Sequence, residues 1–209
     1  MMDLDGLTQN LIKMIQTTKT YLFDAFKAYE THNEDVKKMD DDKVDDLERV
    51  IEEECLHIIL KERPFAHDLR KVTGYFKLVE DIERLGDHAE DIFWCSSNLA
   101  SEETYDLVDL DNMIDVALKM VTDSFKSVIY EDEKLAQSVI NEDDIVDDLY
   151  LKVLNELPIL KKKKKVNTNF VIYTTLITKY VERIADHASN IAERAIYIKT
   201  GYYKNKVII

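Results

Sequence analysis

The sequence predicts an all-α fold made of two tandem three-helix bundles that are related by internal duplication. Only 4 glycines and 2 prolines occur in 209 residues, too few for the many tight turns of a β-rich fold. Apolar residues make up 45% of the chain and recur at helical spacing in six stretches. Two of these stretches, about 99 positions apart, carry nearly the same phrase, which indicates an internal repeat.

Three helices are expected in the first half of the chain. Apolar periodicity marks one helix from about residue 11 to 33 and a second over residues 44–59. Pro64 is expected to end the second helix, because proline lacks an amide proton and clashes with the preceding turn. The third helix carries apolar residues at alternating steps of four and three, the seam of a helix that packs along another. These seam residues are Leu78, Ile82, Leu85, Ala89 and Ile92.

The second half is expected to repeat this order of three helices. Apolar residues mark a fourth helix over residues 114–129 and a fifth over 146–157, and the fifth is expected to end near Pro158. The sixth helix has the same alternating seam as the third. Its seam residues are Ile177, Val181, Ile184, Ala188 and Ile191.

Two repeated phrases support the duplication. "DIERLGDHAEDI" at residues 81–92 returns as "YVERIADHASNI" at 180–191, and "VDDL" at 44–47 returns at 146–149. The two offsets nearly agree and keep the same order, as expected for copies that differ in loop length. We therefore expect one bundle over residues 1–102 and the other over residues 103–209.

Acidic residues are spaced four apart on both members of each repeated helix pair. On the third and sixth helices they share a face that lies roughly 140° around from the apolar seam. Like charges at this spacing repel by a few tenths of a kcal/mol, so an offsetting interaction is expected. The residues concerned are Glu83, Asp87 and Asp91, then Glu182, Asp186 and Asn190, and on the second and fifth helices Asp41, Asp45, Asp143 and Asp147.

These carboxylates predict a cation site in each bundle. If the second and third helices of a bundle are antiparallel neighbours, their acidic pairs face each other and gather oxygen atoms at one spot. Such a cluster requires raised pKa values or a bound cation. Carboxylate oxygens suit Mg, Ca, Mn and iron, and they can bridge two ions. A solvated acidic face is the alternative, because 42 of the 209 residues are Asp or Glu.

The net charge of −14 and the pI near 4.8 argue against a nucleic-acid-binding protein, which needs clustered Lys and Arg to neutralise phosphates. No apolar run approaches the 18 or so residues that cross a bilayer, and "MMDLDGL" lacks the pattern of a signal peptide. A cytoplasmic location is therefore expected. Cys55 and Cys95 form no disulfide framework and are predicted to be buried thiols.

Five segments together resemble the PhoU family of phosphate-signalling proteins over nearly the whole chain: "DDKVD", "RPFAHDLR", "VEDIERLGDHAEDI", "DDIVD" and "VERIADHASNIAE". The resemblance implies a Glu/Asp-x-x-x-Asp motif, twice per bundle, that holds a multinuclear metal cluster of iron or zinc. On that pattern the first bundle would use Asp41 and Asp45 with Glu83 and Asp87, and the second Asp143 and Asp147 with Glu182 and Asp186.

The chain departs from the family pattern at a few positions. Ala185 stands where the family often has Gly, and the small size is kept. At the third position of the stripe Asp91 replaces a frequent Asn, whereas Asn190 retains it, and both are included as metal-ligand candidates. His88 and His187 each follow a proposed ligand and point about 100° away from it, so they are expected to support the site or to lie at the surface rather than bind the same ion.

The family resemblance implies a cytoplasmic regulator of phosphate homeostasis, without enzymatic activity. Such a protein couples the ATPase of the phosphate ABC transporter to a sensor histidine kinase and represses phosphate-starvation signalling. A metal-dependent hydrolase or oxidase is one alternative, since bridged ions activate water. However, the Glu54-x-x-His57 element occurs once, whereas four-helix di-iron proteins use it twice. A plain helical scaffold is the other alternative.

Lys161 to Lys165 form the one concentrated basic run. Such runs are typical of solvated loops. Contact with anionic lipid at a membrane surface, or with an acidic partner, is the alternative interpretation. The sequence leaves a homodimer open.

Overall fold

The computed structural model of the chain describes residues 4–31, 42–99, 107–204 and 206–207. Within these ranges the predicted all-α fold is confirmed, with one short β-hairpin in addition. The helices are α1 (Leu4–Thr31), α2 (Asp42–Glu62), α3 (His67–Leu99), α4 (Val108–Tyr130), α5 (Glu133–Lys162) and α6 (Thr168–Thr200). The strands β1 (Tyr202–Tyr203) and β2 (Lys206–Val207) pair antiparallel. No described helix is both long and apolar enough to cross a membrane.

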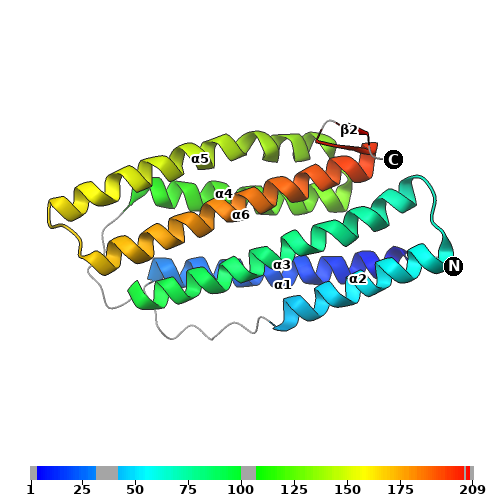
Figure 1. Cartoon of the computed structure of the whole chain (residues 1–209), viewed down its shortest axis with the longest axis horizontal. Coiled ribbons are helices and arrows are strands. Elements are labelled where there is room, and N and C mark those ends of the chain that lie inside the picture. The colour runs from blue at the N-terminus through cyan, green and yellow to red at the C-terminus, as the bar shows by residue number, and fades with distance from the viewer. Residues whose placement is uncertain (1–3, 32–41, 100–106, 205, 208–209) are drawn as a thin grey trace.

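The helices form two three-helix bundles that lie side by side along the long axis of the molecule (Figure 1). Helices α1, α2 and α3 contact one another, as do α4, α5 and α6. The most extensive contact of any two helices joins α3 to α6, across the two bundles. The buried side chains therefore make one continuous core. The expected boundary between residues 102 and 103 lies outside the described residues.

The ten predicted seam residues are confirmed as core. Each is fully buried, with 0% of its side chain exposed. The regular spacing of apolar residues predicted the buried face of both helices. Helices α3 and α6 contact each other and the other helices of their own bundles. Cys55 and Cys95 are also buried, as predicted.

The predicted end of the second helix is confirmed, and a glycine ends the sixth helix. Helix α2 ends at Glu62, just before Pro64, and Arg63 then turns the chain with φ of 49°. Gly201 ends α6 in the left-handed conformation, with φ of 84°, and its amide donates to the Tyr197 carbonyl at 2.8 Å. Left-handed backbone favours glycine at that position.

The prediction that the fifth helix ends near Pro158 is wrong. Helix α5 continues through Pro158 to Lys162. A proline inside a helix removes one backbone hydrogen bond and costs roughly 3 kcal/mol. Leu157 and Leu160 are buried on either side of it, with 1% and 4% of each exposed, and burying two such side chains stabilises the helix by a similar amount, roughly 3–6 kcal/mol. Tertiary packing therefore stabilises the helical conformation beyond Pro158.

Candidate metal centre

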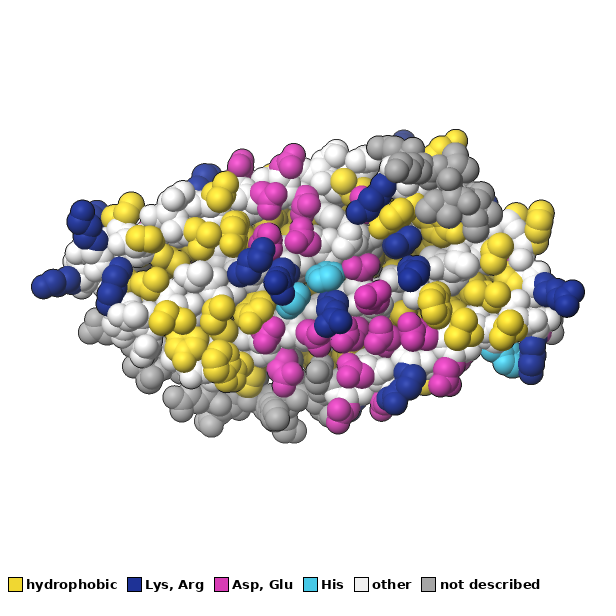
Figure 2. Space-filling view, viewed as in Figure 1, with side chains coloured by type: hydrophobic (Ala, Val, Ile, Leu, Met, Phe, Trp, Pro, Cys, Tyr) yellow, Lys and Arg dark blue, Asp and Glu magenta, His cyan; other side chains and the backbone are white. Residues whose placement is uncertain are grey.

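Two acidic clusters lie on the face formed by α2, α3, α5 and α6 (Figure 2). In that view Asp and Glu side chains gather in an upper and a lower group, and His, Lys and Arg side chains lie between them. The α2–α3 cluster consists of Asp45, Glu48, Glu80, Glu83 and Asp87. The α5–α6 cluster consists of Asp143, Asp147, Glu182 and Asp186.

Close packing of antiparallel helices brings the α2–α3 cluster together. Helices α2 and α3 form a hairpin, and Val44 of α2 packs against Gly86 of α3 (Figure 1). A Cβ at Gly86 would lie 3.6 Å from Val44, which is ordinary van der Waals contact, so a small residue is enough. The equivalent Ala185 is buried in the second half. Asp45 follows Val44 directly and so lies at the same level as the acids of α3.

The electrostatics of Glu83 show that the acids of α2 and α3 act on one another. The pKa of Glu83 is raised to about 7, first by burial and then by the charges of Asp87, Glu48 and Asp45, while Arg84 opposes them. The pKa of Glu48 is raised by burial and then by its acidic neighbours on both helices. Asp45 of α2 therefore lies near enough to Glu83 of α3 for its charge to act on that carboxyl group.

Arg84 partly neutralises this cluster. Its Nη1 donates to Asp87 Oδ2 at 2.9 Å, and its Nε lies 3.4 Å from Glu83 Oε2. The side chain of Arg84 is about half exposed, so water screens its charge and the repulsion among the acids is only partly offset.

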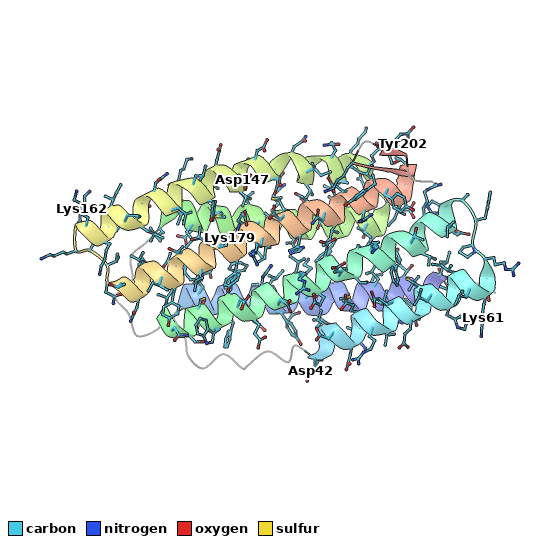
Figure 3. All side chains as sticks on the ribbon, in the orientation of Figure 1. Asp42, Lys61, Asp147, Lys162, Lys179 and Tyr202 are labelled. Carbon is cyan, nitrogen blue, oxygen red and sulfur yellow. The ribbon has the colours of Figure 1, made fainter. Side chains whose placement is uncertain are left out.

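The α5–α6 cluster has the same construction. The pKa of Asp143 is raised to about 6, first by burial and then by the charges of Asp186 and Asp147. The pKa of Asp186 is raised by burial and by Glu182, and Lys179 opposes the shift. Figure 3 shows Asp147 on α5 and Lys179 on the neighbouring α6. The four predicted acids of this half therefore lie together.

The two clusters differ at two positions that the repeat relates. Glu80 of the first half corresponds to Lys179, and Glu48 corresponds to Tyr150. Lys179 Nζ lies 2.5 Å from Glu182 Oε2 and 5.4 Å from the centre of the Tyr150 ring. A cation–π contact and an ion pair thus replace two carboxylates. The α2–α3 cluster is the more acidic of the two.

The sequence prediction missed Glu48 and Glu80. A usable signal was present, because each lies three residues from a predicted ligand, Asp45 or Glu83, and so one turn along the same helix face. Asp41, which was predicted, lies outside the described residues.

The two third-position candidates, Asp91 and Asn190, lie at the contact between α3 and α6. Burial and then Asp87 raise the pKa of Asp91, while a hydrogen bond from Tyr180 lowers it. Asn190 Nδ2 donates to Asp81 Oδ1 at 3.2 Å, although Asn190 also lines the hollow that contains Asp143. Their polar contacts therefore join the two halves.

Two histidines meet at the centre of this face. The ring centres of His88 and His187 are 5.5 Å apart, and His187 Nδ1 lies 2.9 Å from Asp81 Oδ1. They flank a hollow of about 630 Å³, which is also lined by Arg84 and Arg183. Burial, followed by His187 and the two arginines, lowers the pKa of His88 to about 4 and keeps its ring neutral. The repeat relates the two histidines, so equivalent residues of the two halves meet here.

The donor set of both clusters suits a hard or borderline cation. Carboxylates from two helices lie near one another, and burial and neighbouring charges raise the pKa of Glu83 and of Asp143. As the described side chains are placed, no group of three or more His, Cys, Asp or Glu is arranged to hold a metal ion. The chemistry of the residues fits a cation, and metal binding itself stays a prediction.

Replacing Glu83 by Gln should stabilise the metal-free chain increasingly as the pH rises from about 4.5 to about 7. In that window Glu83 keeps its proton in the folded state, whereas the unfolded state has lost it, so the wild-type free energy of unfolding falls with pH. After allowance for solvent screening the difference should reach about 1–2 kcal/mol. Urea denaturation of both proteins across this pH range measures it.

The comparison with the variant is necessary because His88 acts in the opposite sense. Its lowered pKa makes the wild-type chain more stable as the pH rises from about 4 to 6.5. His88 is common to both proteins, so its effect cancels in the difference. Glu30→Gln, at an exposed position of α1, is the control and should show no pH-dependent difference. A constant difference for Glu83→Gln would contradict the raised pKa.

Comparison with known proteins confirms the predicted family. The family model "PhoU domain" matches residues 11–93 and 110–195. A phosphate-specific transport system accessory protein PhoU homolog of Clostridium acetobutylicum is 33% identical over 204 residues, covering 95% of this chain and 93% of that protein. A homolog of the same name in Aquifex aeolicus is 36% identical over 204 residues, covering 95% and 92%.

Solved structures agree with this result. The crystal structure of PhoU from Pseudomonas aeruginosa superposes with a TM-score of 0.89 at 29% identity, covering 95% of this chain and 98% of that chain. The phosphate transport system regulatory protein PhoU from Streptococcus pneumoniae has the same fold, with a TM-score of 0.88 at 23% identity over 100% of both chains. The chain therefore belongs to the PhoU family.

Proposed function

We propose that this chain is a cytoplasmic, metal-binding accessory protein of a phosphate-specific transport system. The observation that carries the metal-binding proposal is the juxtaposition of carboxylates from antiparallel helices in both halves, together with the raised pKa values of Glu83 and Asp143. The accessory role rests on family membership and on the names of the relatives.

The residues that would hold the cations are the acidic pairs of each half. Asp41, Asp45, Glu83 and Asp87 would serve the first site, and Asp143, Asp147, Glu182 and Asp186 the second. When bound, iron or zinc supplies the positive charge that lets facing carboxylates ionise together. Glu48 and Glu80 would add charge around the first site, and Arg84 would orient Asp87 through their 2.9 Å hydrogen bond.

The regulatory part of the proposal concerns the partners. We propose that the chain contacts the ATPase of a phosphate ABC transporter and a sensor histidine kinase, and that it represses phosphate-starvation signalling. A cation bound between the acids of each cluster would fix the distance between α2 and α3 and between α5 and α6. The shape of the face between them would then depend on metal loading. We propose no catalytic role, because the relatives are accessory and regulatory proteins.

A complementation experiment tests this proposal. In cells that lack the chain, wild-type protein should restore repression of a phosphate-starvation reporter when phosphate is plentiful. A variant with four cluster acids neutralised should leave the reporter on, because its sites no longer bind metal. The substitutions are Glu83→Gln, Asp87→Asn, Glu182→Gln and Asp186→Asn. Elemental analysis of both purified proteins should find metal in the wild type alone.

The matched control removes four exposed acids outside the clusters, so that the net charge changes equally. Its substitutions are Glu30→Gln, Glu62→Gln, Asp115→Asn and Glu133→Gln. This control should repress like the wild type. Full repression by the cluster variant would refute the role of the metal sites, and an absence of repression by the wild type would refute the regulatory role.

A further inference from the structure

A concentrated positive charge lies at one end of this acidic molecule. Lys161 to Lys165 occupy the end of α5 and the turn into α6, and Figure 3 shows Lys162 at the left end of the long axis. All five lysines are exposed. The rest of the chain carries the other 23 of its 28 Lys and Arg, against 42 Asp and Glu. The molecule is thus positive at this tip on a body that is negative overall.

The tip is a defined turn. The amide of Lys163 donates to the Ile159 carbonyl at 3.0 Å, and the amide of Lys165 donates to the Leu160 carbonyl at 3.1 Å. Buried Leu160 and Val166 anchor the turn on both sides of the run. Because the backbone is held at both ends, the five ammonium groups are presented together at the end of the molecule.

Four of the tip lysines, Lys161 to Lys164, are not paired with carboxylates of the part of the chain that the structure describes. Within the described residues, Lys161 to Lys164 take part in no ion pair. Lysines elsewhere do: Lys119 Nζ lies 2.5 Å from Glu142 Oε1, and Lys126 Nζ lies 3.0 Å from Asp123 Oδ1. The charge of these four lysines is therefore available to an outside partner.

We propose that this lysine tip binds end-on to a membrane surface of anionic lipids. Figure 2 shows Lys and Arg side chains standing out from the left end of the molecule. A convex tip that offers charge in several directions suits a planar surface whose headgroups rearrange around it, where each lysine contributes almost independently. Ile159, 52% exposed beside the run, adds an apolar contact at the headgroup level. The acidic body is repelled by the same lipids, which leaves the tip as the contacting end.

Co-sedimentation of the purified chain with vesicles tests the proposal. The chain should bind mixed phosphatidylcholine and phosphatidylglycerol vesicles at about 0.1 M salt, and should be released at about 1 M salt, where the screening length falls to about 3 Å. It should not co-sediment with vesicles of pure phosphatidylcholine. The triple variant Lys162→Gln, Lys163→Gln and Lys164→Gln should bind roughly 100-fold more weakly, because each lysine near such a surface contributes about a fivefold factor.

The control variant changes the net charge by the same amount on α1. Lys13→Gln, Lys19→Gln and Lys27→Gln, all at exposed positions, should bind vesicles like the wild type. Equal loss in both triple variants, or no binding of anionic vesicles by the wild type, would overturn the proposal. Binding of the wild type to soluble poly-glutamate but not to vesicles would also overturn it, and would assign the tip to an acidic protein. Repeating the assay with chelator separates this result from the fate of the proposed metal sites.

Discussion

Zinc or iron added to the metal-free chain should raise its free energy of unfolding by about 3 kcal/mol for each half that becomes occupied, at free metal about 100-fold above the dissociation constant. The physical reason is that the facing carboxylates repel one another in the folded chain and are far apart in the unfolded one. A cation binds the folded arrangement and converts repulsion into attraction. Thermal unfolding with increasing metal measures the effect.

The two halves should respond unequally, because Glu48 and Glu80 of the α2–α3 cluster correspond to Tyr150 and Lys179 in the second half. Exchanging the side chains that differ tests this directly. Glu48→Tyr with Glu80→Lys gives the first half the pattern of the second, and metal affinity there should fall by roughly 10-fold to 100-fold, as outer partners of a metal site typically contribute. The reverse exchange, Tyr150→Glu with Lys179→Glu, should raise the affinity of the second half. Titration calorimetry measures both.

Each exchange serves as the other's control, since the two replace pairs of positions that the repeat relates. Metal that stabilises neither protein would contradict ligation by the clusters. Identical affinities in the wild type and in both exchanged proteins would contradict the role of Glu48 and Glu80 while leaving the proposed ligands in place.

Replacing Gly74 by Ala should destabilise the chain by about 1–3 kcal/mol, the usual cost of overpacking. A Cβ at Gly74 would lie 2.4 Å from Ile198 Cγ1 and 2.8 Å from Ile198 Cδ1, so α3 and α6 would have to move apart. Ile198 is fully buried and has little room to shift. The better helix propensity of Ala offsets up to about 1 kcal/mol. Chemical denaturation measures the difference.

Gly86→Ala is the matched control on the same helix. Its Cβ would lie 3.6 Å from Val44, in ordinary contact, so the variant should equal or slightly exceed the wild type in stability. If both glycine variants are equally stable, the close approach of α3 and α6 at Gly74 is not as tight as the structure has it.

Apolar spacing predicted the buried face of α3 and α6 correctly, because a helix that packs along another must repeat its contacts every three or four residues. It could not predict that these two helices pack on each other across the bundles. A seam such as Leu78 to Ile92 specifies only that a partner exists. The continuation of α5 through Pro158 was missed for a related reason, since the burial of Leu157 and Leu160 becomes visible only with the tertiary structure.

The acidic clusters were predictable where their members lie one turn apart on the same helix. Pairs four residues apart led to Glu83, Asp87 and their counterparts in α6, and the structure brings those described pairs together. The contacts of Asn190 and His187 with Asp81 were missed, because they cross between halves that are more than 100 residues apart in the chain. No local periodicity carries that information.

The α3–α6 contact also has a consequence for the history of the molecule. A single bundle of this kind would expose the apolar face of its third helix. Two identical copies would bury that face by pairing where His88 and His187 meet in this chain. Joining two such copies in one chain would make that contact intramolecular and independent of protein concentration. The two halves of one chain can also differ in sequence at equivalent positions. Glu80 and Lys179, which carry opposite charges, are one such pair.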